Sequence, residues 1–320
     1  MIGTGSMGTR ERVDTALAAS RSDGCLVLVT ETSEATLRWA NSTMTTNGHT
    51  TSRQFSVVSV IGDSVGVVGG TGTDADEVRG VVAASEDAAR QSGPARDAAP
   101  LVTGAATADF AEPAAQTSIG VFAQLAEQLA AAFGESRARG DLLYGFAEHR
   151  LETSWLASST GLRRRWVQPT GTIEINGKAA DDLARSAWVG DCPVDFTTLE
   201  LDALTRELRR RLDWSARRLD LPAGRYETIL PPSATADLMI DLVQEMDGRP
   251  AHEGRSAFSA PSGGGTRVGE RLTGMPLALV TDPAEPDLRS EPFLTTIASS
   301  DAVSVFDNGA PLGRTEWLRD

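Results

Sequence analysis

The sequence of 320 residues contains only two cysteines and three histidines, and it has no long apolar run. Cys25 and Cys192 lie far apart in no recognisable spacing, so no disulfide framework is predicted and a reduced, cytoplasmic setting is expected. No stretch approaches the roughly 18–20 consecutive apolar residues that a membrane span requires. The N-terminal residues lack the apolar core and cleavage site of a signal peptide. We therefore expect a cytoplasmic protein without a membrane partner.

Basic residues are fewer than acidic ones, with 30 Lys and Arg against 44 Asp and Glu, which gives a formal net charge of −14 at pH 7. An acidic surface repels the phosphates of nucleic acids, so a nucleic-acid partner is not expected. Apolar residues make up 40% and charged residues 23% of the chain, as in ordinary soluble globular proteins. At roughly 100–200 residues per domain, the length predicts two domains.

The histidines do not form a recognisable metal site. A helical zinc-hydrolase motif needs two imidazoles one turn apart, as in H-E-x-x-H. His252-Glu253 is the only His-Glu pair, and Ser256 and Ala257 follow one turn later. His252 is therefore interpreted as a surface residue, and His149 as a polar residue on a half-exposed strand. Gly62-Asp-Ser-Val-Gly66 fits the letters G-x-S-x-G, but it lies at a tight connection between two predicted strands and not between a strand and a helix, so an α/β-hydrolase is not supported. No G-x-x-x-x-G-K-[ST] loop is present, so a P-loop nucleotide site is not supported either.

Hydrophobic periodicity predicts alternating groups of strands and helices. Short links favour an antiparallel meander over residues 25–69, with Asn47-Gly48 as a turn between strands. Asn176-Gly177 is predicted to be a second hairpin turn. The predicted helices cover residues 10–20, 74–91, 119–139, 199–219 and 233–246. The predicted strands cover residues 25–30, 34–40, 53–60, 64–69, 142–153, 154–159, 166–176, 226–230, 277–281 and 302–306.

These elements predict an α+β fold, with an N-terminal sheet-and-helix domain followed by a β-rich C-terminal domain. Residues 1–9 are expected to be a disordered tail or a tag remnant, and residues 10–220 the N-terminal domain. Residues 221–320 are expected to begin the C-terminal domain.

Four segments in order resemble the TldD/PmbA family, once called modulators of DNA gyrase. One is Leu221-Pro-Ala-Gly-Arg-Tyr-Glu-Thr-Ile-Leu-Pro-Pro232, followed by the predicted helix to residue 246. Two others are Leu37-Arg-Trp-Ala-Asn41 with the strands and helix after it, and Thr153-Ser-Trp-Leu-Ala-Ser-Ser-Thr-Gly-Leu-Arg163. The last is C-terminal and consists of Pro292-Phe293, Phe306-Asp-Asn-Gly309 and Arg314-Thr-Glu-Trp-Leu-Arg-Asp320. Family members continue beyond this last segment, so the resemblance implies that the C-terminal domain is truncated at residue 320.

The resemblance implies a specific role. One subunit type of the family carries H-E-x-x-x-H on the helix after the L-P-x-G-x-Y strand, where two histidines hold zinc and the glutamate activates water. The corresponding segment here, Ala234-Thr-Ala-Asp-Leu-Met-Ile-Asp-Leu-Val-Gln-Glu245, contains no histidine. The chain therefore resembles the PmbA (TldE) subunit, which has no metal site and pairs with a zinc-bearing TldD-type subunit. The heterodimer is expected to hydrolyse unfolded or modified peptides.

Two alternatives remain open at the level of sequence. Asp237 and Asp241 share a helix face at i, i+4, and together with His252 they could form an unrecognised ligand set of a self-sufficient metallopeptidase. We expect no catalytic or metal-binding residue in this chain. The acidic pair is accordingly interpreted as part of an exposed, solvated face of the helix. The other alternative is a peptide- or protein-binding module without proteolysis.

Overall fold

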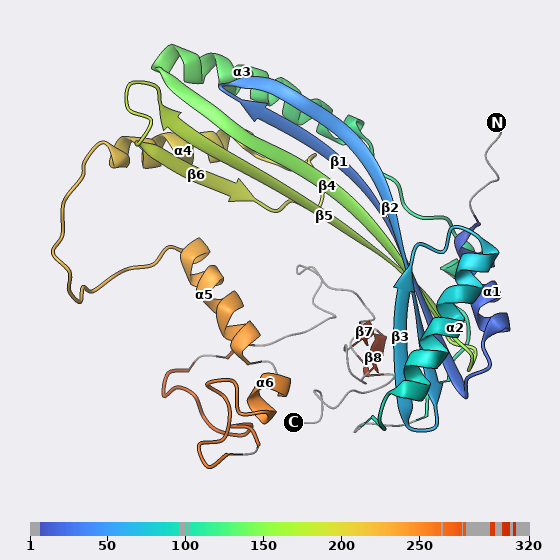
Figure 1. The fold of residues 1–320 in the computed structure, drawn as a ribbon. Helices are drawn as coiled ribbons and strands as arrows, with labels where there is room; N and C mark the ends of the chain where they lie inside the picture. The colour runs from blue at the N-terminus through green and yellow to red at the C-terminus, as the bar shows by residue number, and fades with distance from the viewer. Residues whose placement is uncertain are drawn as a thin grey trace.

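The computed structural model describes residues 7–95, 100–101, 103–246, 248–263, 265–276 and 278–279, and the backbone at 295–297, 303–307 and 310–311. Its main feature is a six-stranded antiparallel sheet in the order β3-β2-β1-β4-β5-β6 (Figure 1). The predicted α+β class is confirmed. The strands are β1 (Gly24–Ala40), β2 (Thr43–Ile61), β3 (Ser64–Gly70), β4 (Asp141–Ser158), β5 (Arg163–Ala179) and β6 (Ser186–Asp191).

Four of these strands are longer than the sequence pattern predicts. The strands predicted at 25–30 and 34–40 form the single strand β1, and those at 142–153 and 154–159 form β4. The prediction of hairpin turns at two Asn-Gly dipeptides is wrong. Asn47-Gly48 lies inside β2, and Asn176-Gly177 lies inside β5. The β1–β2 turn instead uses Asn41 and Ser42, with φ values of 50° and 53°.

One face of the sheet carries both main hydrophobic clusters. Successive side chains of a strand point to opposite faces, so the buried odd-numbered residues of β1, from Cys25 to Trp39, share one face. The helices α1 (Thr9–Ala19) and α2 (Ala75–Gln91) cover one end of this face. The helices α3 (Ala123–Arg139) and α4 (Leu201–Ser215) cover the other end.

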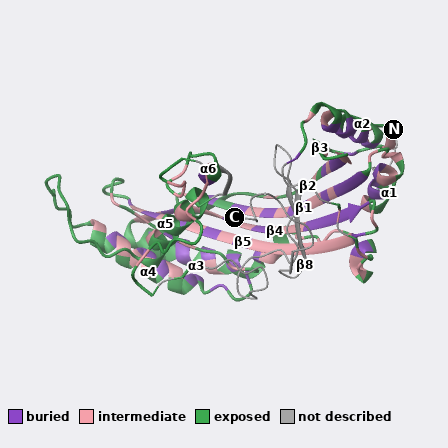
Figure 2. Ribbon diagram, turned by 90° about the horizontal axis from the view of Figure 1, so that it is seen from below, coloured by how far each residue is buried: buried purple, intermediate pink, exposed green. Residues whose placement is uncertain are grey.

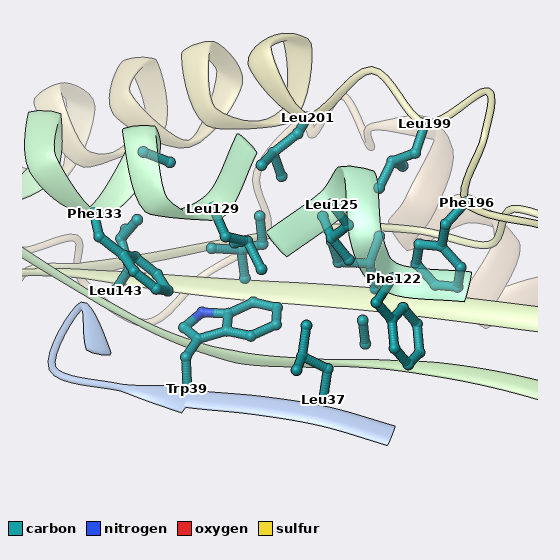
Figure 3. Close-up of a cluster of buried hydrophobic side chains, with 14 of the residues drawn as sticks. Leu37, Trp39, Phe122, Leu125, Leu129, Phe133, Leu143, Phe196, Leu199 and Leu201 are labelled. Atoms are coloured by element: carbon teal, nitrogen blue, oxygen red, sulfur yellow. The ribbon is translucent and has the colours of Figure 1, made fainter. Parts of the chain in front are cut away.

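The cluster under α3 and α4 is the larger of the two (Figure 3). Trp39 of β1 packs against Phe133 of α3, with ring centroids 6.4 Å apart. Phe122, in the short 3-10 helix η2 (Ile119–Phe122), meets Phe196 edge to face at 4.8 Å. Burial of aromatic side chains of this size makes a large hydrophobic contribution to stability. This cluster therefore fixes α3 and the segment before α4 on the sheet.

The described residues after α4 pack differently. The helix α5 (Pro232–Glu245), predicted as residues 233–246, has no buried residue. A short helix α6 (Gly248–His252) follows it. The strand predicted at 226–230 is wrong, because these residues form no strand. The strand predicted at 302–306 is confirmed as β8 (Val303–Asp307), between β7 (Thr295–Ile297) and β9 (Ala310–Pro311), whereas most of 277–281 lies outside the described residues.

Residues at the N-terminal end of the described chain contact the domain. Met7 is buried, and its backbone N–H donates to the carbonyl oxygen of Thr73. Thr9 is the first residue of α1. Residues 1–6 of the predicted tail lie outside the described residues. Across the described ranges, the helices are either too short or too polar to cross a lipid bilayer.

Candidate functional site

The face of the sheet opposite the helices carries a row of polar side chains, here called the open face. In β1 this row consists of even-numbered residues, which alternate with the buried odd-numbered ones. Its members from β1 are Thr30, Thr32, Glu34, Thr36 and Arg38. Figure 1 shows that the sheet is strongly curved, and Figure 2 shows much of β5 as intermediate in exposure. The middle of this face is therefore partly accessible to a ligand.

Charged side chains gather where β1 and β4 pair. Glu34 of β1 lies opposite Arg150 of β4, and Thr36 lies opposite Glu148. The Arg150 guanidinium donates to Glu152 at 2.6 Å. At strand spacing these side chains are close neighbours, so three carboxylates and a guanidinium border one patch of sheet.

The pKa of Glu148 is raised above its usual value. Burial is the largest cause and the negative charge of Glu34 adds to it, while Arg150 and Arg38 act in the opposite direction. The Glu148 carboxyl group can accept hydrogen bonds from donors on a ligand, and the positive charges of Arg150 and Arg38 lie near it. This chemistry suits recognition of polar groups on a ligand.

Aromatic rings flank the charged patch on the same face. The guanidinium carbon of Arg38 lies 5.9 Å from the centroid of the Phe146 ring, and the Lys178 ammonium lies 5.6 Å from the Tyr144 ring. Farther along the strands, the hydroxyl oxygens of Thr30 and Ser154 lie 3.3 Å apart. The open face thus combines hydroxyl, carboxylate, cationic and aromatic groups over a long extended surface. Such a surface can hold a polar, extended chain.

The open face was not identified from the sequence. Its signal is the period-two repeat of charged residues Glu148, Arg150 and Glu152, which sequence reasoning assigned to an ordinary half-exposed strand. The sequence does not reveal that Glu34, which lies more than a hundred residues earlier in β1, sits opposite Arg150 in the folded sheet.

His149 belongs to a polar belt on the covered face, between the two hydrophobic clusters. His149, interpreted from the sequence as a polar residue on a half-exposed strand, lies on the covered side of β4 and is only 6% exposed. Its Nδ1 atom lies 2.6 Å from the Thr117 hydroxyl oxygen. The backbone N–H of Thr117 donates to the Ser33 hydroxyl, which also lies 2.9 Å from Nε2 of His49. Buried polar groups with partners of this kind stabilise the fold, so the belt is structural.

The two aspartates singled out in the sequence lie on α5. Asp237 and Asp241 are both exposed. Apolar neighbours on the helix are exposed as well: Leu238, Met239, Ile240 and Val243. α5 contains no imidazole, so it cannot supply the two histidine ligands of a helical zinc site.

Other ligand and nucleophile candidates are equally scattered. His252 ends α6, and it forms no three-residue metal group with Asp237 and Asp241. Over the whole described part of the chain, no group of three or more His, Cys, Asp or Glu side chains could hold a metal ion. Burial raises the pKa of the Cys25 thiol to about 11, which disfavours a reactive thiolate there. Cys192 is exposed.

Comparison with known proteins identifies the fold. No protein-family model and no curated protein matches the sequence. Solved structures do match. TldE from Thermococcus kodakarensis is 11% identical, with a TM-score of 0.50 over 63% of this chain and 46% of that chain.

Two proteins described as candidate modulators of DNA gyrase match over more of the chain. The one from Bacteroides thetaiotaomicron is 12% identical, with a TM-score of 0.60 over 78% of this chain and 59% of that chain. The one from Thermotoga maritima is 12% identical, with a TM-score of 0.62 over 78% of this chain and 58% of that chain. The chain thus spans about half to three-fifths of the length of these structures. The resemblance to the TldD/PmbA family is confirmed at the level of fold, and this chain shares its architecture with TldE and the gyrase-modulator structures.

Proposed function

We propose that this chain is the noncatalytic subunit of a TldD/TldE-type heterodimeric zinc metalloprotease that cleaves unfolded or modified peptides. The observation that carries the proposal is α5, which follows the L-P-x-G-x-Y segment and contains no histidine. The fold shared with TldE supports the same assignment. On this proposal the zinc belongs to a TldD-type partner, and the protein works in the cytoplasm.

The open face supports a part in holding the peptide. Its hydroxyl and charged groups can hydrogen-bond a polar extended chain, and Glu148 and Arg150 provide groups of both signs. None of these groups is a nucleophile paired with a base, so the face suits binding rather than bond cleavage. This subunit would therefore line the space in which the partner cleaves its substrate.

We also propose that a second domain begins near residue 221. The described residues between α4 and α5 are exposed, and α5 has no buried side chain. A helix with exposed Leu238, Ile240 and Val243 is suited to packing against further structure. That structure would come from the β-rich C-terminal domain or from the partner subunit.

The test is reconstitution with a TldD-type subunit that carries H-E-x-x-x-H. The two subunits should co-purify, and the pair should hydrolyse an unfolded protein that this chain alone leaves intact. Asp237→Ala combined with Asp241→Ala should leave the activity of the pair nearly unchanged. Replacing the glutamate of the partner's motif should abolish it.

Three results separate this proposal from the alternatives. Stoichiometric zinc in the isolated chain, together with hydrolysis, would establish a self-sufficient metallopeptidase. A loss of activity in the double aspartate variant as large as that caused by removing the partner's zinc would overturn the noncatalytic role. Binding of an unfolded peptide by this chain, with no TldD-type partner and no cleavage, would favour a plain binding module.

A further inference from the structure

The first half of β2 has a free edge. β2 pairs with β1 along nearly its whole length, but β3 pairs only with Phe55–Ile61 on the other side. No other strand of the described chain pairs with residues 43–54 on that side. Most of these residues are exposed, and β2 lies at the border of the sheet in Figure 1. In an edge of this length, alternate residues leave roughly six outward N–H and C=O pairs without a strand partner.

This edge lacks the usual protection against pairing. Natural edge strands are commonly protected by lysine, proline, inward charges or bulges. Residues 43–54 contain no lysine, proline, aspartate or glutamate, although the whole chain has a net charge of −14. Their one basic side chain, Arg53, pairs with Glu31 of the same chain at 3.0 Å and lies near the end of the edge. The one irregularity is a register shift opposite Arg38 and Trp39, which leaves residues 46–54 regular. Two copies of this acidic chain could therefore approach along this edge without opposing carboxylates.

The sequence of the edge is symmetric. It reads Thr45-Thr46-Asn47-Gly48-His49-Thr50-Thr51, with threonines at equal distances on either side of Gly48. In an antiparallel pair related by a two-fold axis, residues equally far from the axis face one another. With the axis at Gly48, Thr46 faces Thr50 of the second copy and Asn47 faces His49. Cross-strand threonine pairs are favourable, and the glycine at the axis places no side chain between the two copies.

We propose that this edge is a dimer interface, in which β2 of one copy pairs antiparallel with β2 of a second copy about a two-fold axis at Gly48. The two sheets then form one continuous sheet with both open faces on the same side. The inference rests on backbone geometry and edge sequence, and it does not depend on the proposed protease role.

The test uses opposed and matched charges at two facing positions. Sedimentation equilibrium of the full chain should show a dimer. Thr46→Lys combined with Thr50→Lys places lysine opposite lysine twice, and it should weaken the dimer at least tenfold. Thr46→Glu combined with Thr50→Lys places opposite charges across the axis, and it should keep the dimer. Within each chain, these latter substitutions face Arg38 and Glu34, so they add no internal repulsion.

A control variant carries the same added charge away from the edge. Gln124→Lys with Ala130→Lys adds the same charge at exposed positions of α3, and it should leave the dimer intact. Circular dichroism confirms that each variant is folded. A monomeric wild-type chain, or a dimer that is unaffected by the two lysines at 46 and 50, overturns the proposal. A monomeric glutamate–lysine variant overturns the register at Gly48. If the chain stays monomeric and a different subunit or a peptide occupies the edge instead, the second copy is excluded as the occupant.

Discussion

The Nδ1 atom of His149 lies 2.6 Å from the hydroxyl oxygen of Thr117, which joins β4 to the segment that leads into η2. Burial lowers the pKa of His149 from 6.5, while a hydrogen bond with the backbone of Val194 and the charge of Asp195 act weakly in the opposite direction. The imidazole is therefore held in its neutral form, in a belt that separates two hydrophobic clusters.

This relationship predicts how stability depends on pH. The folded protein resists protonating His149, whereas the unfolded chain takes up the proton near pH 6.5. The free energy of unfolding, measured by urea titrations at a series of pH values, should therefore fall as the pH drops through 6.5 towards the lowered pKa of the folded state. His149→Gln should cost about 1–3 kcal/mol at neutral pH, because it disturbs a buried hydrogen bond, and it should flatten this pH dependence. The exposed His252→Gln should leave the dependence as it is, and an equally steep curve for His149→Gln would contradict the assignment.

A second prediction concerns the charge on the open face. Because the pKa of Glu148 is raised, its charged form weakens the fold, and this effect grows as the pH rises through the folded-state pKa. Glu148→Gln should therefore raise the free energy of unfolding at pH 7 by roughly 0.2–1 kcal/mol, the range for partly exposed charges.

The matched variant is Glu152→Gln. Glu152 accepts from Arg150 at 2.6 Å, so its neutralisation should not stabilise the protein. Equal stabilisation by both variants would mean that the general negative charge, and not the neighbourhood of Glu148, is responsible.

A third prediction concerns two glycines that differ in their surroundings. A Cβ atom on Gly66 of β3 would lie 2.1 Å from the carbonyl oxygen of Ser85 and 2.2 Å from the backbone nitrogen of Ala89, both in α2. Gly66→Ala should therefore force the strand and helix apart and cost about 1–3 kcal/mol or more. Gly80 lies in the same helix with nothing within 4 Å of its Cβ position. Gly80→Ala should stabilise the protein by about 0.5–1 kcal/mol.

Thermal unfolding of the two alanine variants provides the measurement. The melting temperature should fall for Gly66→Ala and rise for Gly80→Ala. A similar change in both variants would show that β3 does not pack against α2 as closely as described.

A fourth prediction concerns the loop before α2. The Glu77 carboxylate accepts hydrogen bonds from the backbone N–H groups and hydroxyls of Thr71 and Thr73. Chiefly through the bonds from Thr73, these contacts lower the pKa of Glu77 from 4.5 to about 2. The stabilisation is present above pH 4.5 and is lost as the pH falls towards 2. Glu77→Gln should lower stability at neutral pH and remove this part of the acid sensitivity.

Hydrogen exchange can localise the effect. In Glu77→Gln, amide protection at Thr71 and Thr73 should drop, because the neutral side chain has one acceptor oxygen in place of two. Exposed Asp87, on the same helix, offers a comparison, and Asp87→Asn should leave these amides protected.

The sequence predicted the element types of the fold better than the lengths of the strands. The amphipathic pattern of α2 and its N-cap Asp74, which accepts from the backbone of Asp76 and Glu77, are local features and were readable. The break predicted after residue 30 was wrong because Glu31 and Ser33 are polar residues on the covered face. Their partners come from elsewhere in the chain: Arg53 lies 3.0 Å from Glu31, and Ser33 contacts His49. A pattern rule that treats polar residues as loop signals cannot anticipate such distant partners.

Turn prediction failed for a related reason. Asn47-Gly48 has the composition of a tight hairpin, but pairing with β1 holds both residues in an extended conformation. The real turn at Asn41 and Ser42 uses two non-glycine residues in left-handed conformations. For the candidate site, the sequence alone shows that α5 contains no imidazole. The open face could not be predicted, because it forms only when β1 pairs with β4.

That pairing also bears on how the chain folds while it is being made. β1 needs β4 as its neighbour, yet Leu26 pairs with Ser158, which is translated more than a hundred residues later. At roughly 5–20 residues per second, the ribosome takes on the order of 5–25 s to supply that neighbour. During this interval the edge of β1 that pairs with β4 in the folded protein has no strand partner and is open to other chains. Chaperone capture of nascent chains should therefore peak before β4 emerges and decline once it has joined the sheet.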